Sequence, residues 1–164
     1  MMNSKLEKAM NEQIKHELES AHLYLAMSAY FESIGMDGMA NWMRVQVKEE
    51  TEHAMKFYGH IVDRGGRVQL TALAQPKAEW ANPIEAWKEA DKHEDFITGK
   101  INDLVKLAQA EHDFAAIPLL NWFITEQIEE EKNTSAIVSD LEKIGPSGAG
   151  LLMLDKQFGK RDGK

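Results

Sequence analysis

Cysteine is absent from the 164 residues of this chain. Its absence excludes disulfide bonds, thiolate metal sites and cysteine nucleophiles. Positive charge is also in short supply, because 19 Lys and Arg stand against 27 Asp and Glu and give a net charge of −8. A surface that binds nucleic acid is usually rich in basic residues, so we expect no nucleic-acid partner.

Long hydrophobic runs are missing too. No apolar stretch approaches the length of a membrane span, and Met1–Lys8 contain no apolar signal core. Hydrophobic residues make up 43% of the chain and charged residues 28%, which is typical of a globular protein. We therefore expect a single domain over residues 1–164, in a cytoplasmic protein with no membrane partner.

Proline and glycine are few, at 4 and 11 residues, and they separate long segments with helical periodicity. Asp37 and Asp113 are expected to be N-caps of the second and fourth helices. The glycine-rich residues 145–150 are expected to form a hinge before a short last helix, which is too brief to be stable without docking. The pattern predicts an all-α fold with helices at about residues 5–34, 37–64, 82–111, 114–143 and 151–158.

The link between the second and third helices, from Gly65 to Ala81, loses the helical period and contains Pro76. About 28 helical residues span about 42 Å, whereas about 17 extended residues cover about 56 Å. Such a link can run the full length of a bundle and set the third helix parallel to the second. We therefore predict a four-helix bundle with one long crossover between helices two and three.

Each of the four long helices has polar residues in the middle of its apolar stripe. The interrupting residues are Glu17, Glu50 with His53, Glu94, and Gln127 with Glu130. An isolated Glu-x-x-His pair is more often part of a solvated charged face than a metal site. Here, however, all four interruptions fall at comparable depth when the bundle is assembled.

Four carboxylates that converge in a core need compensation, because breaking even one buried ion pair costs about 3–5 kcal/mol. Two divalent cations would supply four positive charges against four carboxylates and leave His53 as a neutral ligand. Bridging carboxylates hold two metals about 3.5–4 Å apart. The pattern therefore predicts a two-metal site between the helices.

Ferritin-like di-iron proteins use such an arrangement, with Glu-x-x-His on two helices. This chain has that motif once, at Glu50–His53, and carries Gln127 and Glu130 where the second would be. Over essentially its whole length the chain resembles the non-haem prokaryotic ferritins. The segments that carry the resemblance are Tyr-Leu-x-Met around Tyr24, Asn41–Arg44, Arg64–Val68, Pro76–Trp80, Trp122, Glu126–Glu131 and Leu154–Lys156.

The resemblance implies iron storage. Fe(II) would be oxidised to Fe(III) by O₂ or H₂O₂ at a di-iron ferroxidase centre and stored as a ferric oxide mineral. The family stores that mineral inside a hollow homo-24-mer, with the short fifth helix at the four-fold contacts. Bacterioferritins have a His at the position of Glu130 and a haem-binding Met at or beside that of Glu52; since this chain has neither, no haem is expected.

The resemblance also implies a role for each candidate residue. The first iron would be held by Glu17, Glu50 and His53. The second would be held by Glu50, Glu94 and Glu130, with Gln127 close by. A third iron site would use Glu49, Glu126, Glu129 and Glu130. Tyr24 would hydrogen-bond near the centre and supply an electron, with Trp122 nearby.

Three alternatives remain at this point. A di-iron peroxidase like rubrerythrin usually has an iron–sulfur domain, which a chain without cysteine cannot contain. A DNA-protecting mini-ferritin places its ligands at a subunit contact and lacks the fifth helix. A non-catalytic helical adaptor would bind no iron at all.

Overall fold

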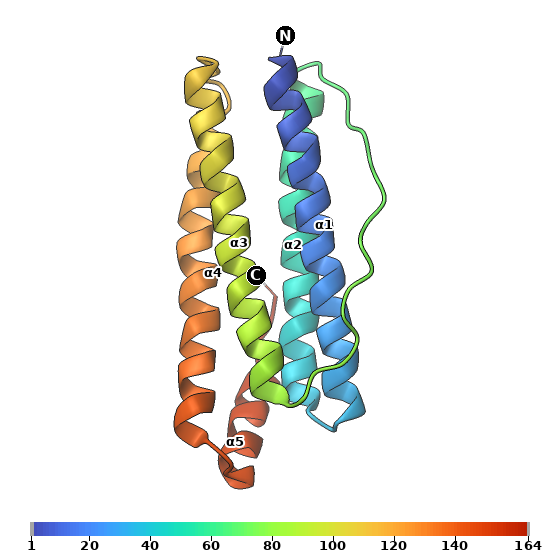
Figure 1. Ribbon diagram of the computed structural model, residues 1–164, viewed down its shortest axis with the longest axis vertical. Helices are drawn as coiled ribbons and strands as arrows, with labels where there is room; N and C mark the ends of the chain where they lie inside the picture. Colours follow the sequence, from blue (N-terminus) through green and yellow to red (C-terminus); the bar gives the residue numbers. More distant parts are fainter. Residues whose placement is uncertain (1, 164) are drawn as a thin grey trace.

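The computed structural model describes residues 2–163, and over this range the chain forms five helices and no strand. The helices are α1 (Ser4–Ser33), α2 (Asp37–Asp63), α3 (Pro83–Ala110), α4 (Ile117–Ile144) and α5 (Gly148–Phe158). The four long helices form a bundle, and α5 lies at one end of it against α2 and α4 (Figure 1). The predicted all-α four-helix bundle is confirmed. Within residues 2–163, no helix combines the length and the apolar character that crossing a membrane would demand.

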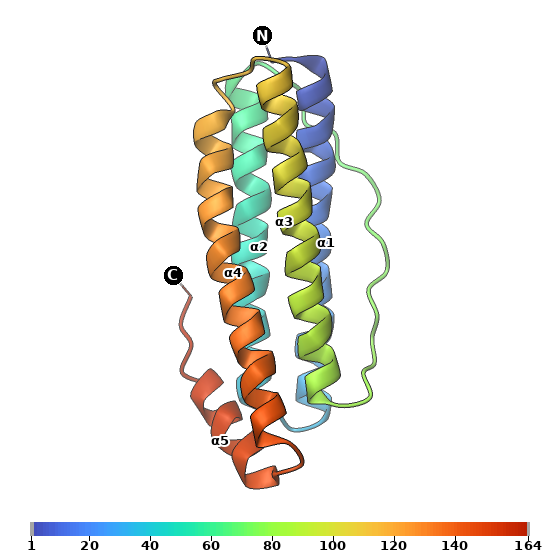
Figure 2. The same cartoon turned by 60° about the vertical axis from the view of Figure 1, so that its left-hand side comes forward.

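The long crossover behaves as its length predicts. The segment between α2 and α3 runs the length of the bundle along the outside of α1, so α2 and α3 are parallel (Figures 1 and 2). Asn11 of α1 holds its first part, because the side-chain amide donates to Arg67 O at 3.0 Å and accepts from Gln69 N at 2.7 Å. Further along, the backbone N–H of Ala74 donates to Glu19 Oε1 at 3.0 Å.

The predicted N-cap of α4 is wrong. This helix begins at Ile117 rather than near residue 114, and its N-cap is Ala116. Asp113 lies in the preceding turn, where its two carboxylate oxygens accept hydrogen bonds from Arg64 at 2.9 and 3.0 Å. A bidentate bond to a guanidinium is stronger than an ordinary cap, so Asp113 ties the end of α2 to the α3–α4 turn.

The predicted N-cap of α2 is also wrong, because Asp37 is the first helical residue and the cap position, Met36, makes no side-chain cap. A carboxylate from α5 caps the start of α2 instead, because Asp155 Oδ1 accepts a hydrogen bond from Met39 N at 2.8 Å. The close approach requires Gly38, where an added Cβ would lie 1.7 Å from Asp155 O. The last helix is therefore docked on its own bundle.

The expected hinge at residues 145–150 is shorter than predicted. Ser147 is the N-cap of α5, and its hydroxyl accepts from Gly150 N at 3.3 Å. The helix thus begins at Gly148, ahead of the predicted residue 151. On its inner side Leu154 and Phe158 are buried, whereas Met153 is 75% exposed.

Two apolar clusters fill the bundle, one at each end. The cluster beside α5 is rich in aromatic side chains and includes Phe31, Trp42 and Trp87. The cluster at the opposite end includes Phe57 and Phe123, whose rings stack with centroids 4.3 Å apart. Between them lies a set of buried polar side chains, which we call the polar layer: Gln13, Glu17, Ser20, Gln46, Glu49, Glu50, His53, Glu94, Gln127, Glu130 and Thr134.

Candidate metal centre

The polar layer brings together the predicted ligands from all four long helices. Glu17 comes from α1, Glu50 and His53 from α2, Glu94 from α3, and Gln127 and Glu130 from α4. Each of these six side chains is exposed by 3% or less. Helical periodicity explains this convergence, because each of these residues occupies a core position of its own helix.

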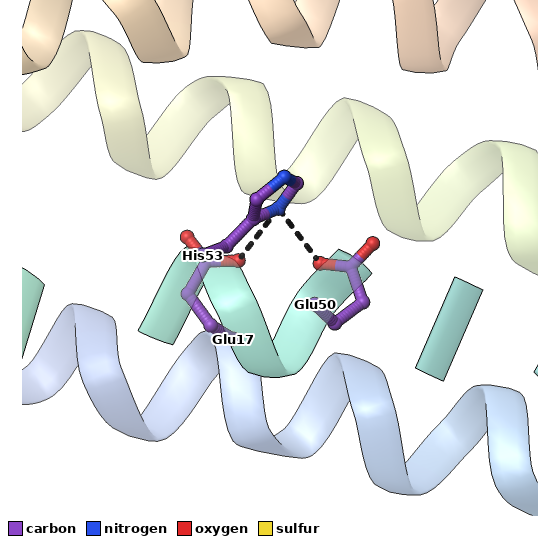
Figure 3. A group of neighbouring side chains, drawn as sticks. All are labelled: Glu17, Glu50 and His53. Atoms are coloured by element: carbon purple, nitrogen blue, oxygen red, sulfur yellow. Dashed lines mark ion pairs between the residues drawn. The ribbon is translucent and has the colours of Figure 1, made fainter. Parts of the chain in front are cut away.

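His53 and two carboxylates form one corner of the layer (Figure 3). The imidazole Nδ1 lies 3.3 Å from Glu50 Oε2 and 4.0 Å from Glu17 Oε2. Neither His53 Nδ1 nor Glu17 Oε2 has a hydrogen-bond partner, although both atoms are buried. Buried polar atoms without partners are rare in native proteins, and here ligand atoms of the three side chains lie within 4.8 Å of one another. This corner could hold a metal ion.

Glu94 is held on the other side of the layer by neutral donors. The Tyr24 hydroxyl donates a short hydrogen bond to Glu94 Oε1, and Gln127 Nε2 donates to Glu94 Oε2 at 3.2 Å. The same amide nitrogen also lies 3.2 Å from Thr98 Oγ1. Tyr24 therefore makes the contact with the centre that was predicted for it, and the Gln127 amide faces Glu94.

Gln46 connects the carboxylates of Glu50 and Glu130, which lie between the His53 side and the Glu94 side of the layer. Its Nε2 donates to Glu50 Oε1 at 2.9 Å and to Glu130 Oε2 at 3.0 Å. The apolar stripes of the sequence did not identify this residue, although Gln46 is fully buried. One signal could have found it: Gln46 precedes Glu50 by four residues, the spacing at which helical side chains meet.

The residues predicted for a third iron site are only partly brought together. His53, Glu126 and Glu130 form a second group with ligand atoms within 4.8 Å of one another, and His53 Nε2 lies 3.8 Å from Glu126 Oε1. Glu49 is not in that group; its Oε2 accepts a hydrogen bond from Arg161 Nη2 at 2.7 Å. Glu129 lies on α4 beside Glu130 and is exposed. Among residues 2–163, neither Glu49 nor Glu129 belongs to either three-residue group.

Three carboxyl groups of the layer, those of Glu17, Glu94 and Glu130, have a pKa above the usual value. Burial, followed by the charge of Glu50, raises the pKa of Glu17 to about 8. Burial and the same neighbour raise the pKa of Glu130 to about 7, and they raise the pKa of Glu94 well above its usual range. Each shift has the sign expected where several carboxylates share a site without enough positive charge.

His53 and Tyr24 respond to the same negative field. Burial by itself lowers the pKa of His53, but the Glu50 carboxylate, with Glu17 and Glu130 behind it, raises this pKa to about 9. Burial and the charge of Glu94 raise the pKa of the Tyr24 hydroxyl well above its usual value. The site favours positive charge on its imidazole and opposes ionisation of its phenol. Oxygen and imidazole donors in such a field suit divalent transition metals.

Aromatic rings close the layer on the side of His53. The imidazole packs edge-on against Trp122 and Phe123, with ring centroids 5.5 and 5.6 Å apart. Trp122 is 37% exposed, and the Lys56 ammonium lies 4.4 Å from the centroid of its ring. Trp122 therefore lies close to the centre, as expected, and forms part of the wall between His53 and the surface.

Fold and site together define a class: a four-helix bundle with a buried carboxylate–histidine cluster that could bind metal. Comparison with known proteins identifies the family, because the family model of the ferritin-like domain matches residues 7–144. The chain is 35% identical over 161 residues to the bacterial non-heme ferritin of Staphylococcus aureus (strain USA300), covering 98% of this chain and 97% of that protein. It is 37% identical over 161 residues to that of Bacteroides fragilis (strain 638R), covering 98% and 100%. The chain belongs to the ferritin family.

Solved structures agree. A form of the Archaeoglobus fulgidus ferritin engineered to be closed is 44% identical, with a TM-score of 0.99 and complete coverage of both chains. The open-pore ferritin of the same archaeon is also 44% identical, with a TM-score of 0.97 over 99% of this chain and 100% of that one. The function is accordingly iron storage with ferroxidase activity. The peroxidase, mini-ferritin and adaptor alternatives are not favoured.

Proposed function

We propose that the polar layer is a di-iron ferroxidase centre in which Fe²⁺ is the substrate. Glu17, Glu50 and His53 bind one iron, and Glu50, Glu94 and Glu130 bind the other, so that Glu50 bridges the pair. The observation that carries this assignment is the pair of buried atoms without partners, Glu17 Oε2 and His53 Nδ1, which lie beside the Glu50 carboxylate. A divalent ion in that corner would satisfy both of them at once.

The oxidation transfers two electrons from two Fe²⁺ ions to one oxidant. O₂ takes them with two protons and becomes H₂O₂, whereas H₂O₂ takes them with two protons and becomes water. The protein holds the two ions at a fixed separation and excludes water from them. Gln46, Gln127 and Tyr24 orient the carboxylates by their hydrogen bonds. Tyr24 also supplies an electron in this proposal, and the hydrogen bond from its hydroxyl to Glu94 supports that role.

We further propose a third iron position beside the pair, formed by Glu49, Glu126, Glu129 and Glu130. Its basis is the second group of facing donors, His53, Glu126 and Glu130. Iron leaves the centre as Fe³⁺ and hydrolyses to a mineral inside a cage of 24 identical subunits in the cytoplasm, as the resemblance implies. The exposed apolar side of α5, where Leu152 is 54% and Met153 is 75% exposed, supports a role for this helix in subunit contacts.

Crystals soaked anaerobically in Fe²⁺ test the assignment through anomalous scattering at the iron edge. We expect two peaks between the four helices, one against His53 and the other against Glu94. The Glu17→Gln variant should lose or weaken the peak against His53 and keep the other. A single peak, or none, between the helices would contradict the di-iron assignment.

A further inference from the structure

The chain after α5 returns to the bundle and places a positive charge against the polar layer. Residues 159–163 turn back from α5 toward the middle of the bundle (Figure 2), where Arg161 contacts Asn41 and Trp42 of α2. Asn41 holds this tail, because its Nδ2 donates to Phe158 O at 3.3 Å and to Arg161 O at 3.0 Å. The Arg161 guanidinium lies over the Trp42 ring, 4.0 Å from its centroid, and donates to Trp42 O at 3.2 Å. Its position is therefore defined by backbone, aromatic and polar contacts together.

The other end of the guanidinium reaches two residues of the layer. Arg161 Nη2 donates to Glu49 Oε2 at 2.7 Å and to Gln46 Oε1 at 3.0 Å. The side chains of Arg161 and Glu49 are only 20% and 10% exposed, so water screens this ion pair less than a surface pair. One further residue connects Arg161 to the predicted iron ligands, because the Gln46 amide nitrogen donates to Glu50 and Glu130.

We propose that Arg161 is a tethered cation that competes with the third iron for the Glu49 carboxylate. This inference rests on the proposed function, in which Glu49 is a ligand of the third site. A metal ion that uses Glu49 Oε2 needs the lone pairs that now accept from the guanidinium. The two cations would also repel each other at that distance. The C-terminal tail thereby keeps the third site closed until Arg161 leaves.

The paired centre does not share this restriction. The polar contacts found for Glu17, His53 and Glu94 within residues 2–163 are with other side chains of the helices, whereas the Arg161 guanidinium donates to Glu49 and Gln46. Fe²⁺ can therefore fill the pair while Arg161 stays in place. The third position fills only at a concentration high enough to displace a bound guanidinium. Arg161 thus sets the order of filling, with the pair first and the third site last.

The test compares two neutralised residues that are adjacent in the tail. Arg161→Gln removes the competing charge, and Lys160→Gln makes the same change in net charge at an exposed side chain. Anaerobic equilibrium dialysis against Fe²⁺ measures the occupancy of each site per chain. Loss of the hydrogen bond between the charged groups of Arg161 and Glu49 should raise the affinity of the third site for Fe²⁺ about tenfold or more in Arg161→Gln. Lys160→Gln should leave it unchanged.

Two further variants make the result specific. Glu49→Gln in the Arg161→Gln background should abolish the gain, because the released carboxylate is then missing. Arg161→Lys keeps the charge but not the forked geometry, and should give a smaller gain than Arg161→Gln. This variant also provides a reading if Arg161→Gln fails to fold. In crystals of the variants, anomalous iron scattering beside Glu49 should rise in step with the affinity.

The outcomes separate the two proposals. If the pair fills normally and the third site binds equally in Arg161→Gln and Lys160→Gln, competition by Arg161 is disproved and the di-iron centre stands. If Arg161→Gln weakens the pair and leaves the third site unchanged, Arg161 acts instead by orienting Gln46, and competition is again disproved. If neither the wild type nor any variant binds Fe²⁺ at the paired centre, the proposed function is disproved, and this inference is disproved with it.

Discussion

Asp113 at one end of the bundle and Glu17 at its middle are both buried carboxylates, but their surroundings differ. Asp113 receives two hydrogen bonds from the Arg64 guanidinium, which hold its pKa below the usual value. Glu17 receives one hydrogen bond, from Gln13 at 2.8 Å, and burial raises its pKa to about 8. The Asp113 carboxylate has an oppositely charged partner in the chain, the Arg64 guanidinium. The Glu17 carboxylate instead faces the His53 imidazole, whose Nδ1 lies 4.0 Å from Glu17 Oε2.

The difference separates structural carboxylates from those arranged for a ligand. A structural carboxylate is stabilising only when its partner is already present, as for Asp113 with Arg64 or Asp155 with the Met39 N–H. The polar layer keeps carboxylates that destabilise the metal-free protein. Such an arrangement is typical of a site that a bound cation completes.

Replacing the carboxylate shared by both iron positions should abolish the activity. In Glu50→Ala we expect the fast oxidation of two irons per chain to slow by more than about 100-fold, the upper figure for residues that only support a ligand. Stopped-flow absorbance after mixing with Fe²⁺ in air measures it. The matched control is Glu52→Ala, an exposed glutamate on the same helix, which should retain the wild-type rate. A normal rate in Glu50→Ala would show that the centre lies elsewhere.

The sequence was sufficient to predict the buried rows of the long helices, and so the central glutamates. Core periodicity placed Glu17, Glu94 and Glu130 correctly because each replaces one apolar side chain in a regular stripe. The partners of Asp113 and Glu49 could not be found in this way. Arg64 and Arg161 are distant in sequence, and their positions depend on how the α3–α4 turn and α5 pack.

The stability of the metal-free protein should fall as pH rises. The folded state holds a proton on Glu17 up to about pH 8, whereas the unfolded state loses it near 4.5, so folding is favoured below 4.5 and this contribution disappears as pH passes through 8. The raised pKa of His53, about 9, adds a change of the same sign at higher pH. Urea denaturation with a chelator present, between pH 5 and 8, measures the slope.

Glu17→Gln is the matched test of that slope, because the amide has nearly the same shape and does not titrate. It should flatten the dependence on pH and make the metal-free protein more stable at pH 8. The exposed Glu52→Gln should leave the slope as it is. An unchanged slope in Glu17→Gln would mean that this carboxyl group titrates normally in the folded protein.

Breaking the structural pair at the bundle end should have the opposite dependence on pH. Asp113→Asn removes the charge that Arg64 binds and should lower the free energy of unfolding by about 2 kcal/mol at pH 7, since a hydrogen bond to a charged group contributes about 1.5–3 kcal/mol. Because the pKa of Asp113 is lowered in the folded protein, the ion pair stabilises the fold above pH 3.8, the pKa of the unfolded state. This stabilisation is lost as the pH falls below that value. The variant and wild type should therefore converge in acid, and iron oxidation should be unaffected.

The contact between α5 and the start of α2 should contribute less. Asp155→Ala removes the acceptor for Met39 N and should cost about 1 kcal/mol, the usual value of a helix cap. Because α5 stabilises its own subunit, truncating the chain after Gly145 would lower both folding stability and assembly. Leu152→Asp separates the two, since Leu152 is 54% exposed and should affect assembly alone. Thermal unfolding and size-exclusion volume distinguish these effects, and a Leu152→Asp protein that assembles normally would exclude this face from the subunit contacts.

The smallest effect is expected at the exposed edge of the layer. Glu129 belongs only to the proposed third position, and its side chain is exposed. Glu129→Ala should therefore leave the first fast oxidation intact. It should change the later phase, either in the oxygen consumed per iron or in the rate at which the centre empties. Stopped-flow runs at two irons per chain, followed by repeated additions of Fe²⁺, separate these phases. Loss of the first fast phase as complete as in Glu50→Ala would show that the pair and the third position act as one site, since a carboxylate bound only to the third iron cannot control oxidation of the other two.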